Sequence, residues 1–181
     1  MTLEQFLNAL ADHERPLRST DLMSLSDMTS EELSLLRHVW PDVDAKRRED
    51  ILGRLIELSE DSLDADFNDL FQFCLSDENP GVKAKAIEGL WECDDRTLVT
   101  PLINLLGQDP SEQVRAAAAM ALGKFAALSQ SGKVLSKDGE KVKRFLIQAI
   151  QNAGESQEVR RRAIEAVAPF NTPYVQQIIQ R

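Results

Sequence analysis

One helical sequence pattern occurs three times along this chain. The copies begin at Val82, Val114 and Val159, and the first two valines are 32 residues apart. Self-similarity at a period of about 20–50 residues is typical of solenoids, in which each unit buries its apolar face only against its neighbours. The pattern therefore predicts a stack of helical units before any local feature is considered.

Within each copy, apolar and small residues recur at fixed positions. Counted from the valine as position zero, positions zero, four, seven and eight share one face of a helix with 3.6 residues per turn. Bulky residues alternate with very small ones on this face, so we expect it to be buried with two helix backbones close together. In chain order these positions hold Val82, Ala86, Gly89 and Leu90, then Val114, Ala118, Ala121 and Leu122, and finally Val159, Ala163, Ala166 and Val167.

A basic residue follows the valine in each copy, as Lys83, Arg115 and Arg160. Asp77 and Asp109 precede the first two of these bases by six residues, at the end of the preceding helix. An acid and a base that recur at the turn between repeats could form a charge ladder linking neighbours. The alternative is that they only cap and solvate each turn, since an exposed ion pair contributes about 0–1 kcal/mol.

Each repeated helix is followed by a polar break and a second apolar helix, as in the segment 94–106. Asn79 and Asp109 are the expected N-caps of the repeated helices. Pro80 and Pro110 then stand just inside the helix starts, where proline sacrifices no helical hydrogen bond. Each unit is thus expected to be an antiparallel pair of helices.

Two of these motifs carry a resemblance to a known family. They are Asn79-Pro80-x-Val82-Lys83-x-x-Ala86-x-x-Gly89-Leu90 and Asp109-Pro110-x-x-x-Val114-Arg115-x-x-Ala118-x-x-Ala121-Leu122-Gly123. They resemble the HEAT repeat family, and more closely the HEAT-like repeats of bilin lyases, over roughly residues 42–181. With the period, the resemblance predicts an all-α fold, a right-handed α-solenoid of antiparallel helix pairs with about ten helices. It implies little about activity, because HEAT arrays serve many functions.

Residues 1–41 lack the repeat pattern and are expected to form a helical cap over the first apolar face. Two capping boxes are expected there, Thr2 with Gln5 and Thr29 with Glu32. The repeat array is expected to follow as one continuous domain. Its units are predicted at about 42–77, 78–109, 110–153 and 154–181.

Two units of the array depart from the pattern. In the first, Val43 and Ile51 keep the spacing of positions zero and eight, but Arg47 stands where an alanine is expected, so its register stays open. In the third, the Ser, Gly and Lys content of residues 129–139 predicts a surface loop.

The composition limits the partners and the compartment. With 43% hydrophobic residues, the 181-residue chain can bury a continuous core. No apolar run approaches the roughly 18–20 residues that span a bilayer, and no basic region precedes an apolar core at the start, which predicts a cytoplasmic protein without a membrane partner. The net charge of −9 and the pI near 4.8 disfavour nucleic acid as a partner.

The sequence contains no recognisable catalytic, cofactor-binding or metal-binding motif, so it predicts a protein that is not an enzyme and needs no cofactor. His13 and His38 have no motif around them, and no Cys-x-x-Cys pair, His-Glu-x-x-His or nucleophile elbow occurs. Cys74 and Cys93 are expected to be small buried hydrophobes on helices, with a disulfide between them as the alternative.

Two basic runs and one tryptophan allow two interpretations each. Residues 46–48 are Lys-Arg-Arg and residues 160–162 are Arg-Arg-Arg, and either run could contact an acidic partner or only be hydrated. Trp91 is expected to fill a gap between repeats, with an exposed interface anchor as the alternative.

One surface supports a specific binding hypothesis. The resemblance implies that the second helix of each pair lines the concave side, and the face opposite its apolar stripe is rich in amides. Amides offer donors and acceptors, which suits an extended peptide backbone, although they could also be ordinary solvated residues. The predicted partner-binding residues are Asn68, Gln72, Asn104, Gln108, Gln148, Gln151 and Gln177.

These observations predict a non-catalytic scaffold that binds another protein through its concave face or its exposed ends. The resemblance adds two other hypotheses: an accessory subunit of a bilin lyase-like complex, and a HEAT-like DNA glycosylase, which the charge disfavours. The last helix, expected from Thr172, ends on an apolar face. This end predicts either further repeats after Arg181 or self-association of the chain through it.

Overall fold

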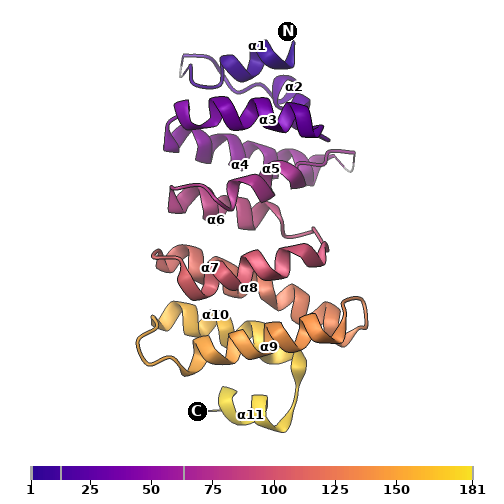
Figure 1. The fold of residues 1–181 in the computed structure, drawn as a ribbon, viewed down its shortest axis with the longest axis vertical. Coiled ribbons are helices and arrows are strands. Elements are labelled where there is room, and N and C mark those ends of the chain that lie inside the picture. Colours follow the sequence, from indigo (N-terminus) through magenta and orange to yellow (C-terminus); the bar gives the residue numbers. More distant parts are fainter. Residues whose placement is uncertain (1, 13, 63, 181) are drawn as a thin grey trace. The chain divides into compact units, whose positions relative to one another are not determined.

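The computed structural model describes residues 2–12, 14–62 and 64–180, and it is all helical there, as predicted. These ranges contain eleven α-helices, four short 3-10 helices and no strand, where the sequence predicted about ten helices. The α-helices (Figure 1) are α1 (Leu3–Asn8), α2 (Ser19–Leu22), α3 (Ser30–Val39), α4 (Ala45–Asp61), α5 (Asn68–Cys74), α6 (Pro80–Gly89), α7 (Val99–Gln108), α8 (Glu112–Gln130), α9 (Ser136–Gln151), α10 (Gln157–Val167) and α11 (Pro173–Ile179). The 3-10 helices are η1 (Met23–Leu25), η2 (Trp40–Asp42), η3 (Arg96–Leu98) and η4 (Ala168–Phe170).

The chain divides into two compact units, Met1–Leu90 and Trp91–Arg181. The first unit contains α1 to α6, and the second contains α7 to α11. The division falls inside the repeat predicted at 78–109. The boundaries expected between a cap and four repeats stay predictions.

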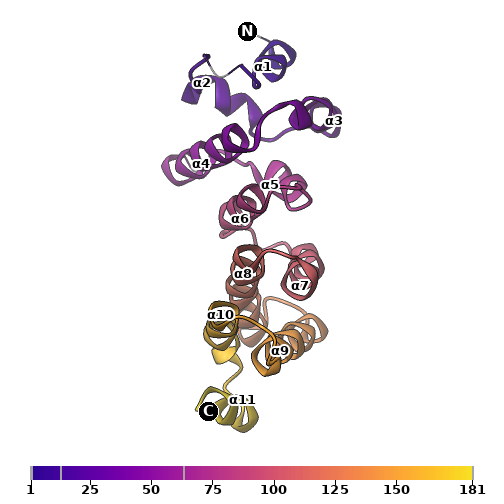
Figure 2. The same ribbon diagram turned by 90° about the vertical axis from the view of Figure 1, so that its left-hand side faces the viewer.

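In the first unit, α4 and α6 lie in one layer and α3 and α5 in another (Figure 2). Helix α1 packs against α3, and α2 packs against α4. Both predicted capping boxes are formed: the hydroxyls of Thr2 and Thr29 accept from the backbone N–H groups of Gln5 and Glu32, whose side chains accept in return from the backbone of each threonine. The Thr29 contacts hold the pKa of Glu32 below its ordinary value.

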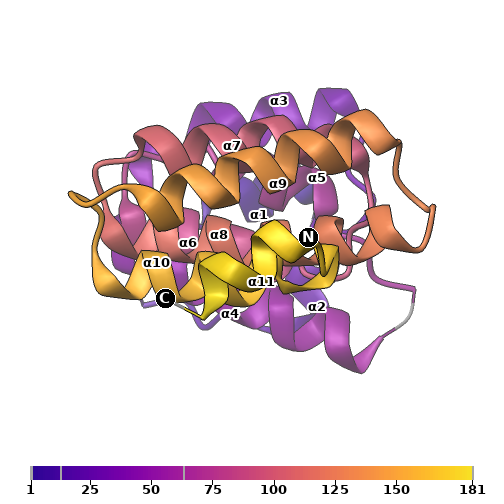
Figure 3. The same ribbon diagram turned by 90° about the horizontal axis from the view of Figure 1, so that it is seen from below.

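The second unit also has two layers. Helices α7 and α9 lie side by side in one layer, and α8 and α10 lie in the other (Figures 2 and 3). The layers meet where α8 contacts α7 and where α10 contacts α9, and α8 also contacts α10 within its own layer. The opposite face of α7 and α9 is therefore left to solvent.

The repeated positions are buried as their spacing predicts. Val82, Val114 and Val159 each have 0% of their surface exposed. The alanines at position four, which are Ala86, Ala118 and Ala163, are equally buried.

Small residues allow close helix contacts in both units. A Cβ atom on Gly89 of α6 would lie 2.5 Å from Cζ of Phe71 in α5, so only glycine fits there. A Cβ atom on Gly123 of α8 would lie 3.1 Å from Cα of Ala166 in α10. Interiors are close-packed, so larger side chains at these positions would force the helices apart.

The N-caps of the repeated helices define one register for all copies. The caps of α4, α6, α8 and α10 are Asp44, Asn79, Ser111 and Ser156. Four residues after each cap comes the basic residue of the copy, which is Arg48, Lys83, Arg115 or Arg160. The first copy therefore has Arg47 at position zero, and the alignment on Val43 is wrong. Ile51 and Leu55 then occupy positions four and eight, and both are fully buried.

Two helix ends differ from the prediction. Ser111, not Asp109, is the N-cap of α8, and the Asp109 carboxylate instead accepts from the Ser111 backbone N–H at 2.9 Å. The loop predicted over 129–139 is shorter, because α8 continues to Gln130 and α9 begins at Ser136. Gly139 is buried against Ser129, so this glycine serves helix packing rather than a turn.

Cys93 and Trp91 also differ from their predictions. Cys74 is buried in α5, and burial raises the pKa of its thiol. Cys93 lies in the connection before η3 and is only half-buried, and both thiols are free, so the alternative of a disulfide is wrong. Trp91 is 53% exposed, because α6 ends at Gly89 and leaves the tryptophan in a turn. Core packing is therefore the wrong interpretation for Trp91.

Ion pairs connect successive repeats within each unit. Arg48 of α4 pairs with Asp77 at 2.8 Å, and the indole N–H of Trp40 donates to the same carboxylate at 2.9 Å. Arg115 of α8 pairs with Glu155, just before α10, at 2.8 Å. In both cases the base of one repeat meets the acid that precedes the next. The charge-ladder hypothesis is therefore confirmed for Asp77. At the turn before α10 the pairing acid is Glu155, which was not one of the predicted acids.

Candidate functional site

The structure brings three of the seven predicted amides into one pocket. Asn104 and Gln108 of α7 and Gln148 of α9 line a pocket of about 350 Å³ between these helices. We call this pocket the amide groove. Gln151 of α9 faces a second pocket, and Gln177 is an exposed residue of α11. Asn68 and Gln72 are half-buried on α5 of the first unit.

The position of the amide groove follows from the spacing of α7. Leu102, Ile103 and Leu106 are buried on the inner face of this helix. Asn104 and Gln108 lie four residues apart, so they share a stripe of the helix on its exposed side. The helical spacing that buries the apolar residues of α7 therefore places its amides on the exposed side.

The amide groove combines an apolar floor with a polar rim. Ile103 and Leu106 of α7 and Phe145 of α9 supply apolar lining, and Asn152 adds a fourth amide. Within the described ranges, the side chains of Asn104, Gln108 and Gln148 make no hydrogen bond to another protein group. Their donors and acceptors are therefore available to a ligand.

One carboxylate, that of Glu155, lines the amide groove. Arg115 donates to both of its oxygens, from Nε at 3.0 Å and from Nη2 at 2.8 Å. These hydrogen bonds hold the pKa of Glu155 below its ordinary value and raise that of Arg115. Glu155 is thus a paired, ionised group in the lining of the groove.

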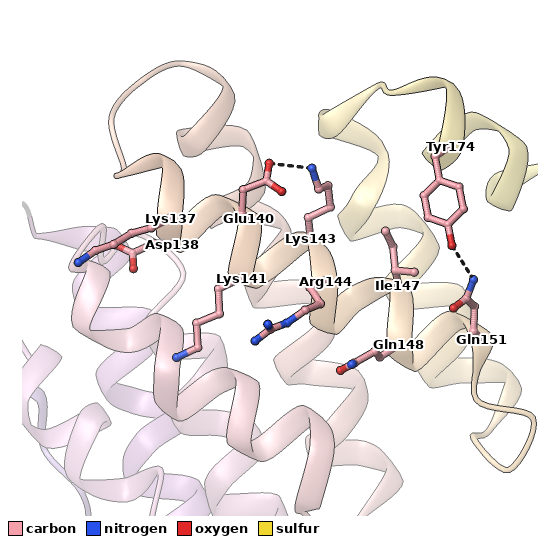
Figure 4. A pocket seen from close by; sticks show the side chains of 10 residues that line it. All are labelled: Lys137, Asp138, Glu140, Lys141, Lys143, Arg144, Ile147, Gln148, Gln151 and Tyr174. Carbon is pink, nitrogen blue, oxygen red and sulfur yellow. Dashed lines mark hydrogen bonds and ion pairs between the residues drawn. The ribbon is translucent and has the colours of Figure 1, made fainter.

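A second pocket, of about 990 Å³, extends along α9 to Tyr174 of α11 (Figure 4). Gln151 donates to the Tyr174 hydroxyl at 3.0 Å at this end. Four basic and two acidic side chains line the pocket. Both acids are already paired, Glu140 with Lys143 at 2.7 Å and Asp138 with Arg96 at 3.5 Å.

Three bases of this pocket, Lys137, Lys141 and Arg144, have no carboxylate within ion-pair distance in the described part of the chain. We call them the basic stripe. Lys141 Nζ donates to the hydroxyl of Thr100 on α7 at 3.0 Å, and the Arg144 guanidinium lies 5.0 Å from the ring centre of Phe145. Lys141, Arg144 and Gln148 point to the same side of α9 (Figure 4).

Sequence reasoning missed the basic stripe because it searched for consecutive bases. The detectable signal was spacing: Lys137, Lys141 and Arg144 are separated by four and then three residues, which is one helix face. The consecutive run at 160–162 is different, because Arg161 and Arg162 both pair with Glu158 and Glu165 on the surface of α10.

The described residues offer no group of three or more His, Cys, Asp or Glu side chains that could hold a metal ion. His38 is exposed in the last turn of α3, and His13 lies outside the described residues. Among the helices of the described ranges, none has the length and apolarity needed to cross a bilayer.

Comparison with known proteins identifies the family. The sequence model described as HEAT repeats matches residues 67–168, which is more than half of the chain. This match does not distinguish the bilin-lyase type from other HEAT repeats. The searches of curated proteins and of solved structures return no match. Taken with the buried small residues, the helix pairs and the ion pairs between repeats, the match shows that this chain belongs to the HEAT repeat family.

Proposed function

We propose that the protein is a non-catalytic interaction module that holds an extended segment of another protein in the amide groove. HEAT repeats present broad surfaces on stacked helices, and protein–protein interaction is a common use of such surfaces. The observation that carries the proposal is a groove in which three amides, Asn104, Gln108 and Gln148, have no protein hydrogen-bond partner within the described ranges and lie above an apolar floor.

The spacing of the amides fits an extended backbone. Asn104 and Gln108 are four residues apart on α7, which is about 6 Å along the helix axis. An extended chain presents the same face every two residues, or about 6.6 Å. Each amide can donate to a carbonyl and accept from an N–H of a strand that follows the helix.

The groove is rigid because its walls belong to the packed core. Leu102 and Leu106 of α7 and Val142 and Leu146 of α9 are buried beneath it. A preformed groove avoids the ordering cost that a flexible site would have on binding. The binding free energy can then come from a small number of backbone contacts and from the apolar floor.

The test is selection of binders from a library of random peptides of about twelve residues, using the whole chain as bait. Enriched peptides are then titrated against Asn104→Ala/Gln148→Ala by fluorescence anisotropy. We expect binding about tenfold weaker, since two hydrogen-bonding groups are lost, with an unchanged melting temperature.

The matched control is Gln113→Ala/Gln157→Ala, which removes two exposed amides from α8 and α10. This variant should bind the enriched peptides as the wild type does. An absence of any enriched peptide, or equal binding by both double variants, would refute the proposed function.

A further inference from the structure

From the basic stripe beside the amide groove, we infer that the bound segment is acidic, with carboxylates at alternate positions. This inference rests on the proposed function and specifies its partner. Its basis is the surplus of positive charge along α9, where Lys137, Lys141 and Arg144 lack carboxylate partners in the described ranges while both acids of the pocket are already paired.

The basic stripe and the amide groove form one continuous surface. Lys141 donates to Thr100, which lies four residues before Asn104 on the same stripe of α7. On α9, Gln148 follows Arg144 by four residues and lines both pockets. A segment that lies along α9 therefore meets charged groups first and amides next.

The dimensions match a short extended segment. From Lys137 to Arg144 the helix rises about 10 Å, and from Lys137 to Gln148 about 16 Å. An extended chain covers these lengths with about three and five residues. Three acids at alternate positions would span about 13 Å, which is about 3 Å more than the three bases, and long basic side chains can absorb this difference.

The surplus of positive charge is confined to one part of a protein that is acidic as a whole. Residues 1–90 contain 20 acidic and nine basic side chains, whereas residues 91–181 contain 10 acidic and 12 basic ones. A long polyanion such as nucleic acid would meet the net charge of −9, while a short acidic peptide needs only the stripe. We therefore favour an acidic protein segment over nucleic acid.

The experiment measures fluorescence anisotropy with three labelled probes. The first is a peptide with three Asp or Glu residues at alternate positions followed by neutral residues. The second carries Asn and Gln in place of these acids, and the third is a short single-stranded oligonucleotide. Each probe is titrated against the wild type, Lys137→Gln/Lys141→Gln/Arg144→Gln, and the control Lys46→Gln/Arg54→Gln/Lys85→Gln.

The control also replaces two lysines and one arginine, but these three residues belong to exposed ion pairs on helices of the first unit. We expect the acidic peptide to bind the wild type and the control alike and to bind the stripe variant about tenfold more weakly. Raising the salt from about 50 to 200 mM should weaken its binding to the wild type. This salt titration tests the inference even if the stripe variant folds poorly.

Three outcomes would overturn the inference. They are equal binding of the acidic and amide peptides, equal loss in the stripe variant and the control, and tighter binding of the oligonucleotide through the same stripe. The proposed function fails separately. If library peptides depend on Asn104 and Gln148 but not on the stripe, the amide groove stands and only the acidic partner is refuted.

Discussion

The start of α4 and the exposed side of α9 are both rich in bases, but the two regions use them differently. Lys46, Arg47 and Arg48 are consecutive, so they leave α4 in three directions about 100° apart. Lys46 forms an exposed pair with Asp50, while Arg48 is buried against Asp77. The three consecutive bases therefore have three different environments. Hydration was the wrong interpretation for Arg47 and Arg48.

Arg47 connects two segments of the first unit. Its guanidinium donates to the backbone carbonyls of Leu10, Asp12 and Arg15, at 3.2, 3.2 and 2.6 Å. It thereby ties the segment after α1 to the first repeated helix. A position that holds valine in the later copies holds arginine here, where it meets the backbone carbonyls of residues 10–15 instead of another repeat.

On α9, by contrast, Lys137, Lys141 and Arg144 share one face because four and three residues separate them. Their positive charges lie together on one surface and are not neutralised by buried carboxylates of the described residues. Spacing, and not local density, therefore distinguishes bases that share one helix face from structural arginines. Four predictions test this difference.

The largest effect is expected for Arg48→Met. The substitution leaves the Asp77 carboxylate, which is 1% exposed, without its cation. Breaking a buried ion pair in this way typically costs about 3–5 kcal/mol in the free energy of unfolding. Urea denaturation followed by circular dichroism measures it. Lys46→Met is the control and should change stability by less than about 0.5 kcal/mol; equal losses in both variants would remove the distinction.

A smaller effect is expected for Arg47→Met. Three hydrogen bonds from a charged donor are lost, but water can replace them at this half-buried site, so we expect a loss of about 1–3 kcal/mol. Hydrogen exchange should become faster in α1 and remain unchanged in α9. Uniform acceleration along the chain would contradict a local tie.

The pair of Arg115 with Glu155 should make stability depend on pH in the acidic range. Because its pKa is lower in the folded chain, Glu155 stabilises the fold above its unfolded pKa, and this contribution is lost as the pH falls through the folded pKa. Glu155→Gln should therefore be less stable than wild type at neutral pH, by about 1 kcal/mol. The difference should shrink near pH 3. A constant difference in urea denaturation at both pH values would contradict this.

The smallest effect on stability is expected for the basic stripe. Lys137→Gln/Lys141→Gln/Arg144→Gln should change the free energy of unfolding by no more than about 0.5 kcal/mol, because these side chains are not paired with any carboxylate that the structure describes. Binding of the acidic peptide should nevertheless fall. A loss of stability comparable with that of Arg48→Met would mean that the stripe has a structural role.

Much of the fold could be predicted from the sequence because close helix packing restricts residue size. Ala118 stands at a position that is alanine in the copies that begin at Val82, Val114 and Val159 and is fully buried, and Gly123 is small because it lies against Ala166 of α10. Single residues were weaker predictors where the same residue type can have two structural roles. Gly139 looked like a loop residue but packs against Ser129, and Arg47 hid the first repeat by replacing its valine.

The candidate site could be predicted only in part. Helix periodicity placed Asn104, Gln108 and Gln148 on second helices, but whether two helices bring their amides together depends on tertiary packing. Trp91 was misassigned because its exposure depends on the point at which α6 ends. The basic stripe was accessible from spacing alone, without any knowledge of packing.

The central claim, that the exposed side of α7 and α9 is the binding surface, is tested most directly by NMR of the whole chain. The side-chain NH2 resonances of Asn104, Gln108 and Gln148 are monitored while the unlabelled acidic peptide is added, with that of Gln113 as reference. We predict that the three resonances shift together and saturate while Gln113 stays unchanged. Saturable shifts confined to other helices, with these three resonances unmoved, would contradict the account.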